Sequence, residues 1–285
     1  MKTKFFIIMA AFAFFSLYSC TKEDTITQVS VDYADDDAVS TAVFDDVFNT
    51  VDNADIILDS YSLSKSLNTV VTDTCPEITI TPLTPGVWPK TITIDFGTGC
   101  TGLYDNTRSG KIIIEITGPR REEGSLKTVT FEDYYFNGIK VEGTHQVENL
   151  GYNTNLNLVF AVRLMDGKLT LPDGQTIEHS FQHQREWTAG MQTRNIWDDE
   201  FLVTGTATGK TINGQAYTNT IMTALKWERA CRFAVSGSVS VDVDGSDPVV
   251  IDYGTGNCDN VATATCNGET KQLQLRFRHR LMTNN

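Results

Sequence analysis

The stretch Val129-Thr130-Phe131-Glu132-Asp133-Tyr134-Tyr135-Phe136-Asn137-Gly138 combines β-branched and aromatic side chains with a terminal Asn-Gly pair. Such a run favours an extended strand, and both residues of Asn-Gly accept the positive φ angles of a type I′ hairpin turn. Five further pairs of this kind follow apolar runs: Asp166-Gly167, Asp173-Gly174, Asn213-Gly214, Asp244-Gly245 and Asn267-Gly268. The repetition predicts a series of β-hairpins.

The same strand pattern extends in both directions from this stretch. Apolar residues alternate with polar ones, or form short apolar runs, at 78–80, 92–96, 112–116, 156–164, 201–206, 217–223, 233–243 and 273–277. Parallel βαβ units are excluded because no helical stretch separates these runs. We expect a mainly β fold over residues 71–285: an antiparallel up-and-down meander, as a sandwich or a curved, half-barrel sheet.

A helical pattern precedes the strands. Val39, Val43, Val47 and Val51 recur every four residues, with phenylalanines on an adjoining stripe, which predicts an amphipathic helix over 38–54. A further short helix over 55–67 would complete a helical segment of residues 38–70. Residues 20–37 are polar and acidic, and we expect a flexible tether that ends in the Asp35–Asp37 charge cluster.

The first 20 residues predict export. Lys2 and Lys4 precede an uncharged run, Phe5 to Phe15, which is about half of the roughly 20 residues that a spanning helix needs. Leu17-Tyr18-Ser19-Cys20 resembles the lipobox of bacterial lipoproteins, which implies that residues 1–19 are a signal peptide and that Cys20 carries lipid. The acyl chains would anchor the protein to a membrane.

The residues after Cys20 bear on the side of the membrane. Lys22, Glu23 and Asp24 resemble the surface-export signal of Bacteroidetes lipoproteins, which implies an outer-membrane lipoprotein facing the cell exterior. A solvated polar tether explains the same residues without an export role.

The charge balance restricts the partners. Without residues 1–19 the chain keeps 21 basic and 36 acidic side chains, a net charge near −15. Such a body repels nucleic acid, so we expect no nucleic-acid partner.

An internal similarity predicts how the cysteines pair. Ile94-Asp95-Phe96-Gly97-Thr98-Gly99-Cys100 matches Ile251-Asp252-Tyr253-Gly254-Thr255-Gly256-Asn257-Cys258, and a second cysteine precedes each copy at a similar distance. We therefore expect Cys75–Cys100 and Cys231–Cys258 disulfides, with Cys266 unpaired. The two copies suggest a duplication or two equivalent sheet edges. No CxxC spacing is present and histidines are few, so we expect no metal site and no cofactor.

The richest local cluster lies at 185–200. Arg185, Glu186, Trp187, Trp197, Asp198 and Asp199 place acids beside tryptophans, which is the composition of a glycosidase cleft or of a carbohydrate-binding face. An ordinary ion pair with tryptophans packed across a loop is the favoured interpretation. His179 and His183 fall on one strand with no third ligand, which does not favour a metal site.

Several segments together resemble a family. Residues 88–100, Arg185-Glu186-Trp187, Trp197-Asp198-Asp199 and Asp252-Tyr253-Gly254 are similar to segments of uncharacterised lipoproteins of flavobacterial type from the Bacteroidetes, over most of the chain from Cys75 to about Leu275. The resemblance implies the location of a lipid-anchored lipoprotein and supplies no catalytic residues.

The expected function is therefore a membrane-anchored, non-enzymatic role in binding or in envelope structure, with a glycan or protein as partner. Two alternatives remain. One is a carbohydrate-active hydrolase that uses Glu186, Asp198 or Asp199, which requires these acids and the tryptophans to share one open cleft. The other is a periplasmic lipid carrier, which requires an apolar cavity inside a curved sheet.

Overall fold

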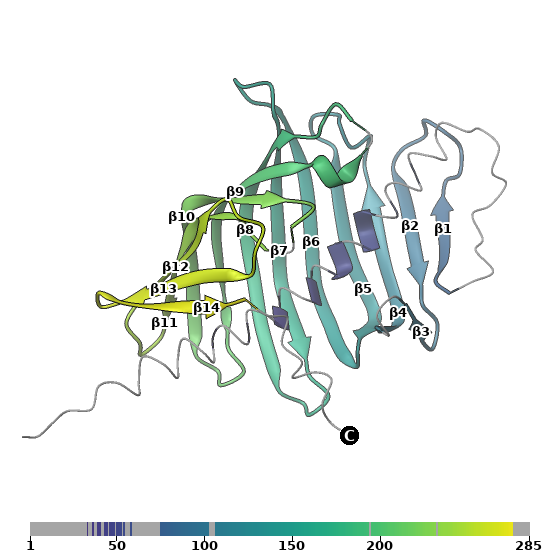
Figure 1. Cartoon of the computed structure of the whole chain (residues 1–285). Coiled ribbons are helices and arrows are strands. Elements are labelled where there is room, and N and C mark those ends of the chain that lie inside the picture. Colours follow the sequence, from purple (N-terminus) through teal and green to yellow (C-terminus); the bar gives the residue numbers. More distant parts are fainter. Residues whose placement is uncertain are drawn as a thin grey trace, which may run out of the picture.

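The computed structural model describes residues 75–102, 106–193, 195–231 and 233–275, and a set of single residues between Tyr33 and Leu58. Within these ranges the chain forms one mainly β fold, as predicted (Figure 1). The first strands are β1 (Glu77–Thr81), β2 (Lys90–Asp95), β3 (Cys100–Thr101), β4 (Thr107–Ile116), β5 (Leu126–Phe136), β6 (Ile139–Tyr152) and β7 (Leu158–Thr170). The remaining strands are β8 (Thr176–Ala189), β9 (Glu200–Lys210), β10 (Ala216–Glu228), β11 (Ser236–Val243), β12 (Val249–Thr255), β13 (Val261–Cys266) and β14 (Glu269–Gln274).

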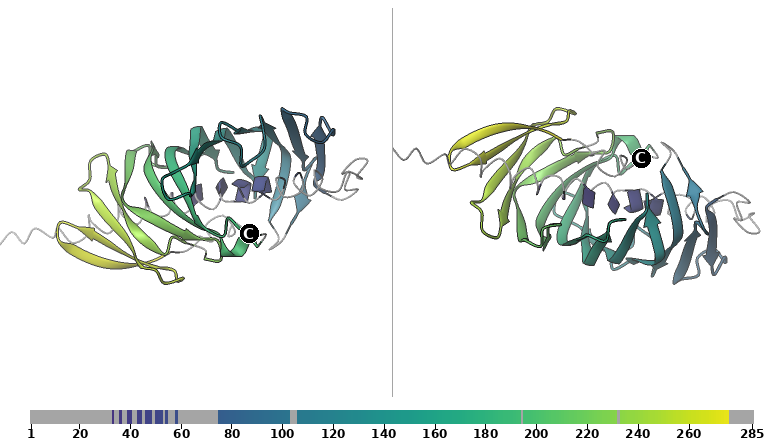
Figure 2. Two further views of the ribbon diagram at one scale, coloured as in Figure 1. Left: turned by 90° about the horizontal axis from the view of Figure 1, so that it is seen from above. Right: turned by 90° about the horizontal axis from the view of Figure 1, so that it is seen from below.

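All 14 strands belong to one antiparallel sheet. Strands that are consecutive in the chain are neighbours in the sheet, except that the short β3 pairs with β4 beside β2. The order runs from β1 to β14 without closing, so the predicted up-and-down meander takes the form of an open, curved sheet. Figure 2 shows this curvature from above and below.

Five of the six predicted turn pairs connect consecutive strands. Asn137 and Gly138 join β5 to β6 with φ angles of 49° and 78°, and Asn267 and Gly268 join β13 to β14 with φ angles of 50° and 81°. Gly174, Gly214 and Gly245 also have positive φ angles at the β7–β8, β9–β10 and β11–β12 turns. Residues that tolerate the left-handed region therefore determine where the sheet reverses.

The sixth prediction was wrong, because Asp166-Gly167 lies inside β7. Asp166 has a φ of 52°, and the pairing of β7 with β8 shifts its register between Leu164 and Gly167. A β-bulge, like a tight turn, needs a residue in the left-handed conformation, but it bends the strand without ending it. A Cβ on Gly167 would lie 2.2 Å from the carbonyl oxygen of His179, so the adjacent strand leaves no room for a side chain.

A helix packs against the concave face of this sheet. The described residues from Tyr33 to Leu58 are helical, and Figure 1 draws them as purple pieces that follow one line across the sheet. Val43, Val47 and Val51 are buried in the same core cluster as residues of β2, β4 and β5 to β9. The valine spacing thus identified the helix and its buried face. Tyr33 and Asp36 are also helical and buried, although both lie within the segment expected to be a flexible tether, so that prediction was wrong for these two residues.

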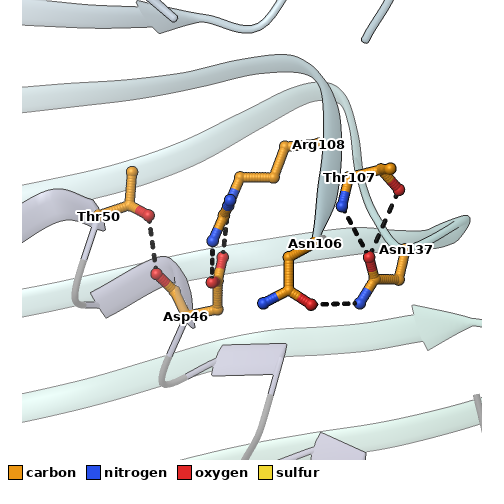
Figure 3. Close-up of polar contacts among 6 residues, drawn as sticks. All are labelled: Asp46, Thr50, Asn106, Thr107, Arg108 and Asn137. Carbon is orange, nitrogen blue, oxygen red and sulfur yellow. Dashed lines mark hydrogen bonds and ion pairs between the residues drawn. The ribbon is translucent and has the colours of Figure 1, made fainter. Parts of the chain in front are cut away.

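Three carboxylates fix the helix to the sheet. The Oδ2 atom of Asp36 accepts a hydrogen bond from the backbone N–H of Ile212, 2.8 Å away. Asp46 forms a two-point ion pair with Arg108 on β4, and its backbone carbonyl accepts a hydrogen bond from the Thr50 hydroxyl (Figure 3). Asp52 pairs with Arg229, which directly follows β10, at 2.8 Å. These contacts set the position of the helix along the sheet.

Both predicted disulfides are present. The Cα–Cα distances are 5.8 Å for Cys75–Cys100 and 5.4 Å for Cys231–Cys258, and the remaining described cysteine, Cys266, is free and buried. The two similar segments also share a local contact. Asp95 Oδ1 accepts a hydrogen bond from the Gly97 N–H at 2.8 Å, and Asp252 Oδ1 accepts one from the Gly254 N–H at 2.7 Å.

The predicted signal peptide, Cys20 and the export residues Lys22, Glu23 and Asp24 lie outside the described residues, as does most of the predicted helix over 55–67. No helix formed by the described residues is long and apolar enough to cross a membrane.

The Asp46–Arg108 pair is testable as a fixing point of the helix. Asp46→Asn leaves the Arg108 guanidinium largely buried without its counter-charge, so we expect the free energy of unfolding in urea to fall by about 3 kcal/mol. The control is Glu148→Gln, which breaks the more exposed ion pair with Arg163 and should cost less than about 1 kcal/mol. Equal losses in the two variants would show that Asp46 does not hold the helix.

Candidate functional site

The cluster predicted at 185–200 is divided between the two faces of the sheet. Arg185 and Trp187 lie on the concave face, where Arg185 lines a cavity with Asp52 of the helix. Glu186 lies on the opposite face, because neighbouring residues of a strand alternate. There its Oε1 atom accepts hydrogen bonds of 2.8 Å from the side-chain amides of Asn153 and Asn157. These two bonds lower the pKa of Glu186 and hold it as a carboxylate.

The second half of the cluster follows β8 in a loop with a short 3-10 helix, η2 (Ile196–Asp198). The side chain of Trp197 is 64% exposed, whereas Trp187 is 5% exposed. The hydroxyl of Thr193 donates to the carboxylate of Asp198 within the same loop, at 2.9 and 3.0 Å from its two oxygens. One tryptophan is therefore a surface group and the other a core group, and they do not border a common cleft.

Asp199 turns inward beside Trp187. It is 4% exposed, and its approach depends on Gly190, where a Cβ would lie 2.3 Å from Asp199 Oδ1. Burial raises the pKa of the Asp199 carboxyl, while Arg120 and Arg229 oppose that shift. The Asp199 carboxylate thus lies close to the basic residues Arg120 and Arg229 on the concave face.

A cavity lies beside these basic residues, between the helix and the sheet. It has a volume of about 40 Å³, and its wall includes Asp52, Trp88, Arg120, Lys127, Phe160 and Arg185. Lys127 Nζ lies 3.8 Å from Asp52 Oδ1, and Arg229 Nη1 lies 2.8 Å from Asp52 Oδ2. We call Arg120, Lys127, Arg185 and Arg229 the cationic cluster.

The cationic cluster determines the ionisation of Asp52. Burial acts to raise the pKa of this carboxyl, but Lys127, Arg120, Arg185 and Arg229 together outweigh burial and hold the pKa well below its usual range. Burial also lowers the pKa of the Arg185 guanidinium. Asp52 is therefore ionised at any physiological pH.

Aromatic rings hold two of these guanidinium groups in place. Arg185 lies over the rings of Phe201 and Phe160, with 4.7 and 5.9 Å between Cζ and the ring centroids. Arg120 lies 5.2 Å from the centroid of Trp187. Stacking of this kind is favourable between a cation and an aromatic face, and it leaves the N–H groups at the edge of the guanidinium free to bind.

Sequence reasoning missed the cationic cluster because its members are far apart in the chain. Arg120 precedes β5, Lys127 lies on β5, Arg185 on β8 and Arg229 after β10. The sequence carried one weak signal for the cluster, since Lys127 lies on the same strand face as the buried Val129. A lysine on the inward face of a strand is rarely buried unless it is paired with an opposite charge.

The histidines of the concave face are structural. His145 packs 4.2 Å from the Phe48 ring, centroid to centroid, and His183 stacks 4.5 Å from Phe181. His179 Nδ1 lies 2.6 Å from the hydroxyl of Tyr217. Within the described ranges, no group of three or more His, Cys, Asp or Glu residues is placed to hold a metal ion.

No family model, curated protein or solved structure matches this chain.

The buried histidines predict an acid-sensitive fold. Burial lowers the pKa of His145 to about 3, and those of His179 and His183 to about 4. As the pH falls from about 6.5 toward 4, these histidines become protonated in the unfolded chain but stay neutral in the folded chain. The free energy of unfolding therefore decreases over this pH range. The loss amounts to as much as about 1.4 kcal/mol per pH unit for each histidine.

Urea unfolding between pH 7 and pH 4.5 measures this loss. His145→Phe keeps an aromatic ring against Phe48 and removes one titrating group, so its stability should depend less steeply on pH than that of the native chain. Identical slopes for the two proteins would contradict the assignment of His145 as a buried neutral group.

Proposed function

We propose that this chain is a lipid-anchored protein of the outer membrane, displayed toward the cell exterior, that binds a ligand without chemical turnover. The observation that carries the binding role is the cavity beside Asp52, whose wall bears the charged side chains of Arg120, Lys127 and Arg185. The address rests on Cys20 and on Lys22, Glu23 and Asp24, together with the resemblance of the chain to Bacteroidetes lipoproteins. Disulfides in the body agree with a location outside the cytoplasm.

The geometry gives the hydrolase alternative little support. A glycosidase needs two carboxyl groups on either side of one scissile bond. Glu186 is bound to two asparagine amides on the convex face, Asp198 accepts a hydrogen bond within a surface loop, and Asp199 is buried.

A lipid carrier needs an apolar space for an acyl chain, and here the helix occupies the concave face. Val43, Val47 and Phe44 are at most 2% exposed and belong to the continuous core. The cavity beside Asp52 has a volume of about 40 Å³ and bears charged groups. A second, mainly apolar cavity beside Tyr33 has a volume of about 20 Å³, which is too small for an acyl chain. This arrangement favours a compact polar ligand over an acyl chain.

The address is tested by protease treatment of intact cells. Added protease should cleave the folded domain of the native chain in intact cells, because the lipid anchor would hold that domain outside the outer membrane. Cys20→Ala removes the acylated thiol, and the protein should then leave the membrane fraction. Replacement of Lys22, Glu23 and Asp24 by alanine should keep the anchor and restore protection in intact cells. A native chain that is cut only in lysed cells would refute surface display.

Absence of turnover is tested on purified protein with a panel of polysaccharides. We expect no release of reducing ends, and the same result for Glu186→Gln as for the native chain. Hydrolysis that disappears in Glu186→Gln would replace the binding role with an enzymatic one.

A further inference from the structure

Three threonines occupy every second position of β9. Thr204, Thr206 and Thr208 are exposed, whereas Ala207 between them is buried in the core cluster. Neighbouring residues of a strand point to opposite faces of a sheet, so the three hydroxyl groups lie together on the convex face. Along the strand they are spaced by about 6.6–6.8 Å, which is twice the rise per residue.

The strands on either side of β9 continue this arrangement. The residues paired with the threonines have hydroxyl or amide side chains: Ser180, Gln182 and Gln184 on β8, and Thr218 and Thr220 on β10. Directly paired residues share a face of the sheet, and each of these side chains is at least partly exposed. We call these residues and the β9 threonines the uncharged face. Its rows are about 4.7–4.9 Å apart, the distance between neighbouring strands.

Charged side chains occupy other parts of the convex face. On β6 and β7, Glu148 and Arg163 form an ion pair at 3.2 Å, and at one end of β8 and β9 Glu178 and Lys210 form another at 2.9 Å. The sequence is 21% charged and has a net charge of −13. A surface that only has to keep a protein soluble carries interspersed charges. The lack of charge on the uncharged face, across three neighbouring strands, therefore calls for a separate reason.

The chemistry of the uncharged face indicates the kind of partner. Hydroxyl and amide groups both donate and accept hydrogen bonds, and a neutral polar group costs less to remove from water than a charged group does. The hydroxyl groups of a sugar have the same dual capacity. Protein partners usually depend on aromatic or arginine anchors, and the uncharged face contains neither. A neutral partner rich in hydroxyl groups therefore matches this face better than a protein or an ionic polymer.

We propose that the uncharged face binds a neutral linear polysaccharide that lies across β8, β9 and β10. A linear glycan presents hydroxyl groups at intervals close to the distance between strands, so successive sugars meet successive rows. The face offers no aromatic ring for stacking, so each sugar gains hydrogen bonds alone and the affinity depends on the length of the glycan. This site is separate from the cavity beside Asp52 and goes beyond the proposed function.

The test is affinity electrophoresis of the purified chain in native gels that contain hydroxyethyl cellulose, glucomannan or dextran. We expect at least one of these neutral polymers to retard the protein, and the anionic polymer polygalacturonate to have no effect. Disaccharides of the retarding polymer should compete on the order of a hundredfold more weakly than its long fragments. Retardation by none of the neutral polymers, or equal retardation by polygalacturonate, would overturn the proposal. Disaccharides that compete as well as long fragments would also overturn it.

Matched variants locate the binding. Thr206→Glu places a carboxylate in the middle of the uncharged face, where a bound sugar would remove water from it, so the affinity should fall by about tenfold or more. Thr130→Glu makes the same change on the convex face of β5, where Thr130 pairs with Ile113, and should leave the affinity unchanged. Equal losses in the two variants would show that the added charge acts from anywhere on the surface, and the proposal would fail.

A second pair of variants removes the hydroxyl group without adding charge. Thr206→Val keeps the β-branched shape that suits a strand, so the protein should fold, and binding should weaken by roughly threefold to tenfold. Thr206→Ser keeps the hydroxyl group and should bind like the native chain. A Thr206→Val protein that binds as tightly as the native chain would contradict the role of this hydroxyl group and overturn the proposal.

Sedimentation equilibrium without polysaccharide tests whether a second copy of the chain occupies the face instead. The native chain and Thr206→Glu should have the same mass in solution. A native dimer that dissociates in Thr206→Glu would assign the face to a contact between copies and overturn the proposal. Retardation by a neutral polymer in a protein that is protected from protease in intact cells would support the proposal and remove only the address.

Discussion

The docking of one amphipathic helix into the concave side of an open sheet is the constraint on which the rest of this structure depends. An up-and-down sheet that does not close exposes an apolar face, and that face is stable in water only when it is covered. The valines of the helix provide the cover, and Asp36, Asp46 and Asp52 fix its position. Without the helix, the inward side chains of β4 to β9 would form a large exposed apolar surface.

The same docking brings Asp52 into the cationic cluster. Asp52 of the helix approaches the sheet where Lys127 and Arg229 contact its carboxylate. The charges of Arg120 and Arg185 also lower the pKa of this carboxylate. The Asp52 carboxylate compensates part of this charge, which fixes the helix.

The sequence predicted the periodic part of the molecule well and the site poorly. Alternating residues and left-handed turn pairs identified the strands, and the valine spacing identified the helix face, because these are local patterns that the backbone imposes. Asp166-Gly167 was wrongly predicted to form a hairpin turn, because a β-bulge and a hairpin turn need the same left-handed backbone conformation. Arg185, Glu186 and Trp187 looked like one cluster because they are adjacent in the chain, but strand alternation sends Glu186 to the other face. Arg120 and Arg229 are joined to Arg185 only by the pairing of distant strands, and no local pattern records that.

The two disulfides have a consequence for how the open sheet resists unravelling. A meander that does not close has two ends, and thermal opening begins at ends. Cys75–Cys100 ties the segment before β1 to β3, and Cys231–Cys258 ties the segment after β10 to the one after β12, closing loops with separations of 25 and 27 residues. Each crosslink of that size restricts the open chain by roughly 3 kcal/mol in the entropic model. The β13–β14 hairpin lies beyond the second crosslink, so we expect it to open most readily and its amide hydrogens to exchange first among those of the sheet.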